Sequence, residues 1–230
     1  CLASHNIAMQ GRVLTLDDTD YPTRLRACLG AEAPVCVASA GPWEILSRHS
    51  LSLFCSVRCP GAMILQTYEF VSRLRHHNIT LVSGFHSPME KECLRALSTG
   101  SAGIVWCLAK ALSAFRLPPE FQALYDAQRL LLFSAFPDHA TRVTADAAAY
   151  RNRVAAALAE DVFLSHAAPG SHTETFCIQA LAWGKTVLTL DAPENTQIIA
   201  RGAQPVRSES IPALWGADPE PEPPHGVDLL

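Results

Sequence analysis

Three arginines stand beside residues that could help them to bind phosphate. Arg58 lies two residues after Ser56 at the end of an apolar run, and Arg151 and Arg153 flank Asn152. A guanidinium group is planar and offers paired N–H donors that fit phosphate oxygens. Side chains two positions apart on a helix point about 200° apart, so Arg151 and Arg153 reach one ligand only near a helix start. The alternatives are a turn with a surface arginine and a solvated helix face.

Two glycine-containing turns follow runs that predict strands. Gly84 ends the run that begins at Leu81, and the pair Gly170-Ser171 precedes a predicted helix. Glycine lets a ligand approach the backbone closely, and the first turn of a helix offers unpaired N–H groups to an anion. These turns therefore predict phosphate contacts, with simple helix capping by Ser171 as the alternative.

The usual signatures of catalysis are missing from the sequence. It contains no P-loop, no GxGxxG motif and no nucleophile elbow, and its histidines are not paired at metal-ligand spacing. His86, Glu90 and Glu174 are weak acid or base candidates, because each stands alone near a helix start. Eight cysteines form no CxxC pair, which favours buried, reduced thiols. We therefore predict no catalytic residue, no cofactor and no metal site.

The charge is distributed unevenly along the chain. The formal net charge is −4, from 18 basic and 22 acidic residues. The segment 208–230 holds five of the acids and no Lys or Arg, so the remainder carries 18 basic against 17 acidic residues, or +1. A nearly neutral body with local arginine clusters predicts an anion bound at a defined site, and argues against unspecific coating of DNA.

Apolar runs without alternation are separated by helical patterns through the middle of the chain, which predicts a doubly wound, mostly parallel α/β sheet. We expect a small N-terminal segment at 1–45, a Rossmann-like domain at 46–207 and a disordered, acidic, Pro-rich tail at 208–230. Strands are expected at 35–37, 51–56, 79–83, 102–108, 130–136, 161–166 and 186–190. Helices are expected at 60–77, 88–99, 118–128, 145–159, 173–183 and 196–201, with short helical stretches at 23–29 and 42–48.

Nothing in the sequence predicts a membrane association. No apolar run reaches the roughly 18 residues that span a bilayer. The first residues, Cys1-Leu2-Ala3-Ser4-His5, have no basic region typical of a secretory signal. Together with the unpaired cysteines, this favours a cytoplasmic location.

Several short motifs occur in one order between residues 15 and 206. They are Tyr21-Pro22, Ala33-Pro34, Phe54-Cys55-Ser56-Val57-Arg58, Leu81-Val82-Ser83-Gly84-Phe85, Glu90, Arg151-Asn152-Arg153-Val154, Gly170-Ser171, and Asn195 with Ile198, Gly202 and Ala203. This series resembles the DprA/Smf DNA-processing family. The Arg-Asn-Arg and Gly-Ala pieces, in the family's order and spacing, make the likeness fairly specific.

The resemblance implies an extended Rossmann-like domain without enzymatic activity. Such a protein binds single-stranded DNA, protects it or delivers it to a RecA-like recombinase in transformation and recombination, and forms a homodimer. Phe85 or Tyr150 would stack on bases. The residues implied to bind nucleic acid or phosphate, or to shape the pocket, are Ser56, Arg58, Gly84, Arg151, Asn152, Arg153, Gly170, Ser171 and Asn195.

The chain departs from the family pattern at several positions. Ser56 and Val57 replace the family's Gly and Ser, the family's Ala-Arg-Gly is His86-Ser87-Pro88, and Leu94 replaces a histidine. The resemblance therefore implies a divergent member whose DNA affinity is reduced or redirected.

Two other functions remain open from the sequence. The turn Pro169–Glu174 is faintly similar to the loop of LOG-type nucleoside-monophosphate phosphoribohydrolases, in which Arg58 would hold phosphate and an acid would assist glycosidic cleavage. A nucleotide sensor in defence or signalling would use the same pocket without turnover.

Overall fold

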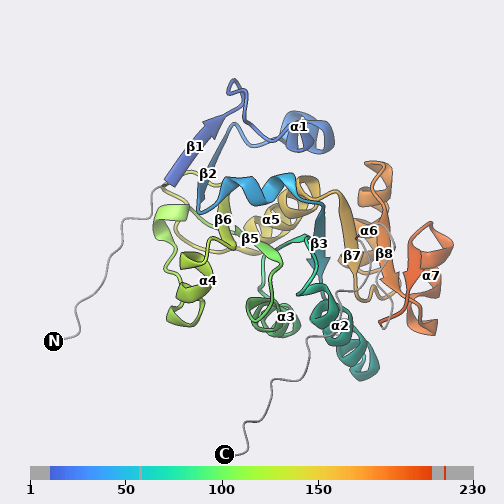
Figure 1. Cartoon of the computed structure of the whole chain (residues 1–230). Helices are drawn as coiled ribbons and strands as arrows, with labels where there is room; N and C mark the ends of the chain where they lie inside the picture. Colours follow the sequence, from blue (N-terminus) through green and yellow to red (C-terminus); the bar gives the residue numbers. More distant parts are fainter. Residues whose placement is uncertain (1–10, 57–58, 209–214, 216–230) are drawn as a thin grey trace, which may run out of the picture.

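A single nine-stranded sheet organises the molecule (Figure 1). The computed structural model describes residues 11–56, 59–208 and 215. The strand order is β1-β2-β6-β5-β4-β3-β7-β8-β9, and β1 and β2 are the antiparallel members. The strands are β1 Gly11–Thr15, β2 Cys36–Ala40, β3 Ser50–Phe54, β4 Thr80–Ser83, β5 Gly103–Leu108, β6 Leu130–Ser134, β7 Asp161–Leu164, β8 Val187–Leu190 and β9 Gln204–Val206.

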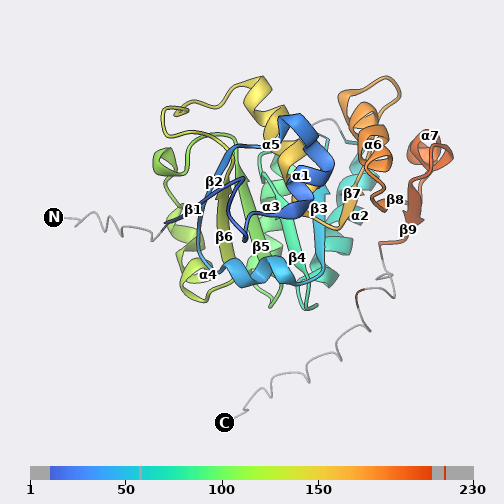
Figure 2. The same cartoon turned by 90° about the horizontal axis from the view of Figure 1, so that it is seen from above.

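Helices cover both faces of the sheet (Figure 2). The helices α2, α3 and α4 pack on one face, in a core with Phe70, Leu94 and Leu124, while α1, α5, α6 and α7 pack on the other. Their bounds are α1 Thr23–Leu29, α2 Gly61–Leu74, α3 Pro88–Ser98, α4 Gln122–Asp126, α5 Ala145–Leu158, α6 His172–Ala182 and α7 Thr196–Ala200. The predicted doubly wound α/β fold is confirmed.

The central strands follow from their composition. Both faces of β3, β4, β6, β7 and β8 are buried, which is why their sequences are apolar without alternation. Strands β1 and β9 were not predicted, because they lie at the edges of the sheet and bury few side chains. Leu14 is the one buried residue of β1, and β9 has none. Strand β2 also extends three residues beyond the predicted 35–37.

The N-terminal strands join the main sheet through β6, where β2 pairs with it in antiparallel register. The boundaries drawn at residues 45 and 207 stay predictions. Most of the tail predicted to be disordered lies outside the described residues. Within it, Ser208 donates a hydrogen bond to Glu69, and Trp215 is buried beside Phe70.

The direction of winding reverses at β3. The chain passes from β3 outward through β4, β5 and β6, and then crosses back to β7 on the other side of β3. In open α/β sheets such a switch point opens a crevice beyond the carboxyl ends of the strands, where ligands bind. The ends of β3 and β7 therefore mark the place to look for a site.

None of the helices in the described ranges has the length and apolar character that crossing a membrane requires. The seven described cysteines are free thiols. Cys55, Cys93, Cys107 and Cys177 are buried, as predicted, whereas Cys36 is exposed.

The packing of the face that α2, α3 and α4 cover can be tested at Phe163. This side chain is fully buried on β7 and stacks on Phe70 with ring centroids 4.6 Å apart. We expect Phe163→Ala to lower the free energy of unfolding by about 3–5 kcal/mol, because it leaves a cavity in a close-packed core. Leu65→Ala, at a position 73% exposed on α2, should change it by less than about 0.5 kcal/mol in the same denaturant titrations. Similar losses in both variants would contradict this account of the core.

Candidate nucleic-acid interface

Two hollows lie at the carboxyl ends of the parallel strands. The switch-point cleft has a volume of about 580 Å³ and lies between the end of β3, α5 and the start of α6. The lysine pocket has a volume of about 170 Å³ and lies at the ends of β4 and β5. The cleft is lined by Phe54, Cys55, Ser56, Glu90, Ala145, Asp146, Ala148, Ala149, Asn152, Arg153, His172, Thr173, Thr175, Phe176 and Gln179, and the pocket by Gly84, Phe85, His86, Lys91, Trp106, Cys107, Leu108, Ala109, Lys110, Phe115, Val143 and Arg151.

Helix α5 separates the two hollows. It begins after Thr144, whose hydroxyl accepts a hydrogen bond from the Ala147 N–H at 3.1 Å. Arg151 lines the lysine pocket, whereas its neighbours Asn152 and Arg153 line the cleft. The triplet lies within the helix and not at its start, so the geometry does not support the two arginines reaching one phosphate together.

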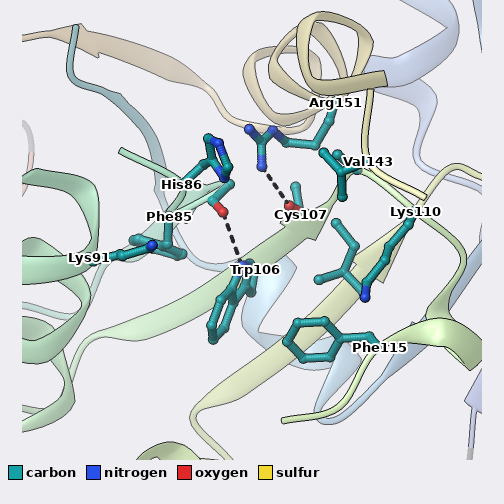
Figure 3. Close-up of a pocket in the computed structure, with 12 residues that line it drawn as sticks. Phe85, His86, Lys91, Trp106, Cys107, Lys110, Phe115, Val143 and Arg151 are labelled. Carbon is teal, nitrogen blue, oxygen red and sulfur yellow. Dashed lines mark hydrogen bonds between the residues drawn. The ribbon is translucent and has the colours of Figure 1, made fainter. Parts of the chain in front are cut away.

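Arg151 is a buried arginine, with only 6% of its surface exposed. Its Nε donates to Oδ1 of Asn152 at 2.8 Å, and its Nη1 donates to the Cys107 carbonyl at 3.4 Å (Figure 3). A Cβ placed on Gly84 would overlap the guanidinium group. Burial lowers the pKa of Arg151, and the nearby Glu90 carboxylate opposes that shift. Because Gly84 has no side chain, the guanidinium group of Arg151 can lie against the backbone at the end of β4. The sequence predicted that a ligand would approach the backbone at Gly84, whereas in the structure Arg151 does so.

Arg153 points away from Arg151 and binds an acid. Its Nη1 donates to Glu32 at 3.0 Å, and this partner raises the pKa of Arg153 and lowers that of Glu32. Glu32 lies in the short helical turn after α1, and its carbonyl also accepts a hydrogen bond from the Tyr150 hydroxyl at 2.8 Å. Arg153 Nε is buried, with no hydrogen-bond partner among the described residues.

The lysine pocket combines cations with aromatic rings. Lys91 and Lys110 line it from two sides and Arg151 from a third (Figure 3). The Trp106 indole donates to the Gly84 carbonyl at 3.0 Å and packs edge-on against Phe115 at 5.2 Å. None of the residues that line the pocket is Asp or Glu.

The pocket residues other than Gly84, Phe85, His86 and Arg151 were missed by sequence reasoning. Lys110 comes two residues after β5, and Lys91 lies in α3, the helix that follows β4. The sequence contains only three lysines, so the positions of Lys91 and Lys110 after β4 and β5 could have indicated the pocket. Cys107 contributes no charge, since burial raises the pKa of its thiol to about 12.

Glu90 caps α3 from within the protein. Its carboxylate accepts hydrogen bonds from the backbone N–H groups of Cys55, His86 and Ser87 at 3.2, 2.8 and 3.3 Å. The Ser87 hydroxyl in turn accepts from the Glu90 N–H, which completes a capping box. These four backbone N–H groups already have acceptors within the protein and are not available to an external anion.

The Gly170-Ser171 turn is arranged in the same way. Ser171 Oγ accepts from the Glu174 N–H at 3.1 Å, and the Gly170 N–H donates to the Glu174 carboxylate at 2.6 Å. The other carboxylate oxygen accepts from Arg201 Nε at 2.9 Å. This geometry favours helix capping over the predicted phosphate contact.

The remaining predicted residues have different surroundings. Asn195 is fully buried, and its amide donates to the carbonyls of Ser165 and Leu190, so it ties β7 to β8 and does not face solvent. Ser56 lines the cleft. Arg58 lies outside the described residues. Across the described ranges, no group of three His, Cys, Asp or Glu residues is placed to hold a metal ion.

Comparison with known proteins gives a family and a fold. The sequence profile described as DNA recombination-mediator protein A matches residues 12–212. The fold is similar to DNA processing protein A (DprA) from Streptococcus pneumoniae, with a TM-score of 0.71 and 18% identity, covering 86% of this chain and 71% of that one. It is also similar to DNA processing protein A from Helicobacter pylori, described for its single-stranded DNA binding mode, with a TM-score of 0.69 and 16% identity over 86% and 91% of the two chains. No curated protein matches the chain.

The close approach of Arg151 and Gly84 yields a test. We expect Gly84→Ala to lower the free energy of unfolding by about 1–3 kcal/mol, because the added methyl group displaces a buried guanidinium. The control is Gly61→Ala at the start of α2, where an added Cβ meets nothing within 4 Å, and where we expect a change below about 0.5 kcal/mol. Equal stability of the two variants in chemical denaturation would show that Arg151 is not held as described.

Proposed function

The chain belongs to the DNA recombination-mediator protein A family, as its motifs predicted, and we propose that it binds single-stranded DNA along the carboxyl edge of its sheet. The switch-point cleft would receive part of the strand, and the neighbouring lysine pocket would receive phosphate. The edge lies at the topological switch of the fold, where ligands of open α/β sheets bind.

The observation that carries the proposal is the placement of the triplet Arg151-Asn152-Arg153. Its consecutive side chains line two hollows that share one helix wall. A nucleic-acid strand is a chain of alternating phosphates and bases, so it can occupy such paired sites in sequence. Aromatic rings near both hollows, Phe54 with Phe176 and Trp106 with Phe115, would offer contacts to bases, which are worth about 1–3 kcal/mol each in single-strand binding proteins.

The wider role rests on the family. We infer that the protein is a non-enzymatic, cytoplasmic homodimer that protects single-stranded DNA or delivers it to a RecA-like recombinase during transformation and recombination. Family membership supports this role.

A nucleotide sensor remains the second candidate, because the cleft has the volume of a small-ligand site and amide groups from Asn152 and Gln179. A phosphoribohydrolase has less support. The acid of its loop corresponds to Glu174, both of whose carboxylate oxygens already have partners in the protein.

DNA binding is tested by fluorescence anisotropy with a labelled oligo(dT) of about 20 nucleotides, a length that exceeds the site of a single domain. We expect affinity to fall with salt, by about 0.7 log units per log unit of salt for each phosphate contact. Arg153→Ala should weaken binding and lower the magnitude of that slope by about 0.7, because it removes one phosphate contact.

The matched control is Glu32→Ala, which breaks the same ion pair but keeps the cation. It should bind the oligonucleotide at least as tightly as the wild type. Equal weakening by both substitutions would mean that the ion pair only supports the fold. No binding by the wild type, even at low salt, would overturn the proposal, and tight binding of a free nucleotide without turnover would then favour the sensor.

A further inference from the structure

The distribution of lysine in this chain is unusual. Of its 18 basic residues, only Lys91, Lys110 and Lys185 are lysines, and the first two line the same small pocket. Lys185 is engaged elsewhere, because its ammonium group donates to the carbonyls of Ala157 and Ala159 at the end of α5. The freely available ammonium groups of the protein are thus gathered in the lysine pocket.

Within the described ranges, neither Lys91 nor Lys110 forms an ion pair with an acid, and Lys110 lies 5.9 Å from the Phe115 ring centre. Arg151 uses two of its five N–H donors on Asn152 and Cys107, which leaves three. The pocket therefore presents three positive side chains to one small volume without an acid in its lining.

We propose that the lysine pocket binds a terminal phosphate, that is, a phosphate monoester at the end of a DNA strand, an inference that rests on the proposed function. A monoester carries a charge of about −1.5 to −2 near neutral pH, whereas a phosphodiester within a strand carries −1. Three cations that line one small pocket match the monoester better, because its larger negative charge offsets more of their mutual repulsion. Lysine suits this task, since its ammonium group is a compact charge with three donors that can turn toward different oxygens.

The small size of the pocket favours the end of a DNA strand over a strand that continues through it. Its volume of about 170 Å³ is less than a third of that of the cleft. Three of its lining residues, Phe85, Cys107 and Arg151, are themselves buried. A phosphodiester must leave by two ester oxygens toward further nucleotides, whereas a monoester has one such connection and three terminal oxygens for the cations.

The test compares oligo(dT) strands of equal length with a 5′-phosphate, a 3′-phosphate or hydroxyl groups at both ends. We expect one phosphorylated strand to bind about tenfold more tightly than the hydroxyl strand, as one additional charge-assisted interaction would give. The double substitution Lys91→Gln and Lys110→Gln should abolish this preference. Arg73→Gln with Arg207→Gln removes the same charge from exposed positions away from the pocket and should preserve it.

The outcomes separate the inference from the proposed function. If the hydroxyl strand binds and phosphorylation adds nothing, the terminal-phosphate site is overturned while DNA binding stands. Equal weakening of all strands by the lysine double substitution would likewise overturn it, because the pocket would then hold internal phosphates. Direct binding of thymidine monophosphate and of thymidine is measured by calorimetry. If the monophosphate binds, thymidine does not and no strand binds, the pocket is a monoester site for a free nucleotide, and the DNA-binding proposal fails instead.

Discussion

The buried guanidinium group of Arg151 fixes the arrangement of the carboxyl edge. It joins α5 to the end of β5 through the Cys107 carbonyl and lies against the backbone at Gly84, at the end of β4. Because it is charged and almost fully enclosed, it is stable there only while these partners stay in place. The same contact holds α5 over the sheet as the wall between the cleft and the lysine pocket. Together with the apolar residues of α5 that pack on the sheet, such as Val154 and Leu158, this buried side chain keeps the two hollows apart.

A second constraint is that carboxylates of the protein itself accept hydrogen bonds at the starts of two helices on this edge. Glu90 occupies the backbone donors at α3, and Glu174 occupies those at the Gly170-Ser171 turn. In many nucleotide-binding folds such N–H groups bind phosphate directly. Since internal carboxylates take that position here, the side chains of Lys91, Lys110, Arg151 and Arg153 are the groups proposed to recognise an external anion.

The fold could be predicted because its central strands are buried on both faces and therefore consist of unbroken apolar runs. The edge strands β1 and β9 carried no such signal, because they bury little surface. The site was predicted less completely. The motif identified α5 and the strand-end turns, but spacing could not reveal that Arg151 is buried, or that Asn195 ties two strands together. Those properties depend on which elements pack together, and no local pattern encodes that.

Charge pairing explains how a chain of net charge −4 can present a positive site. Many of its arginines are bound to acids, including Arg12, Arg24, Arg73, Arg95, Arg201 and Arg207, so they add little to the potential around the molecule. With Arg153, these ion pairs engage seven of the 18 basic residues, whereas Lys91 and Lys110 form no ion pair within the described ranges. A focused potential in a recess with low-dielectric aromatic walls attracts an anion more strongly than the same charges on an open surface. The net charge of this protein therefore does not indicate whether it binds an anion, whereas the position of its unpaired cations indicates where an anion would bind.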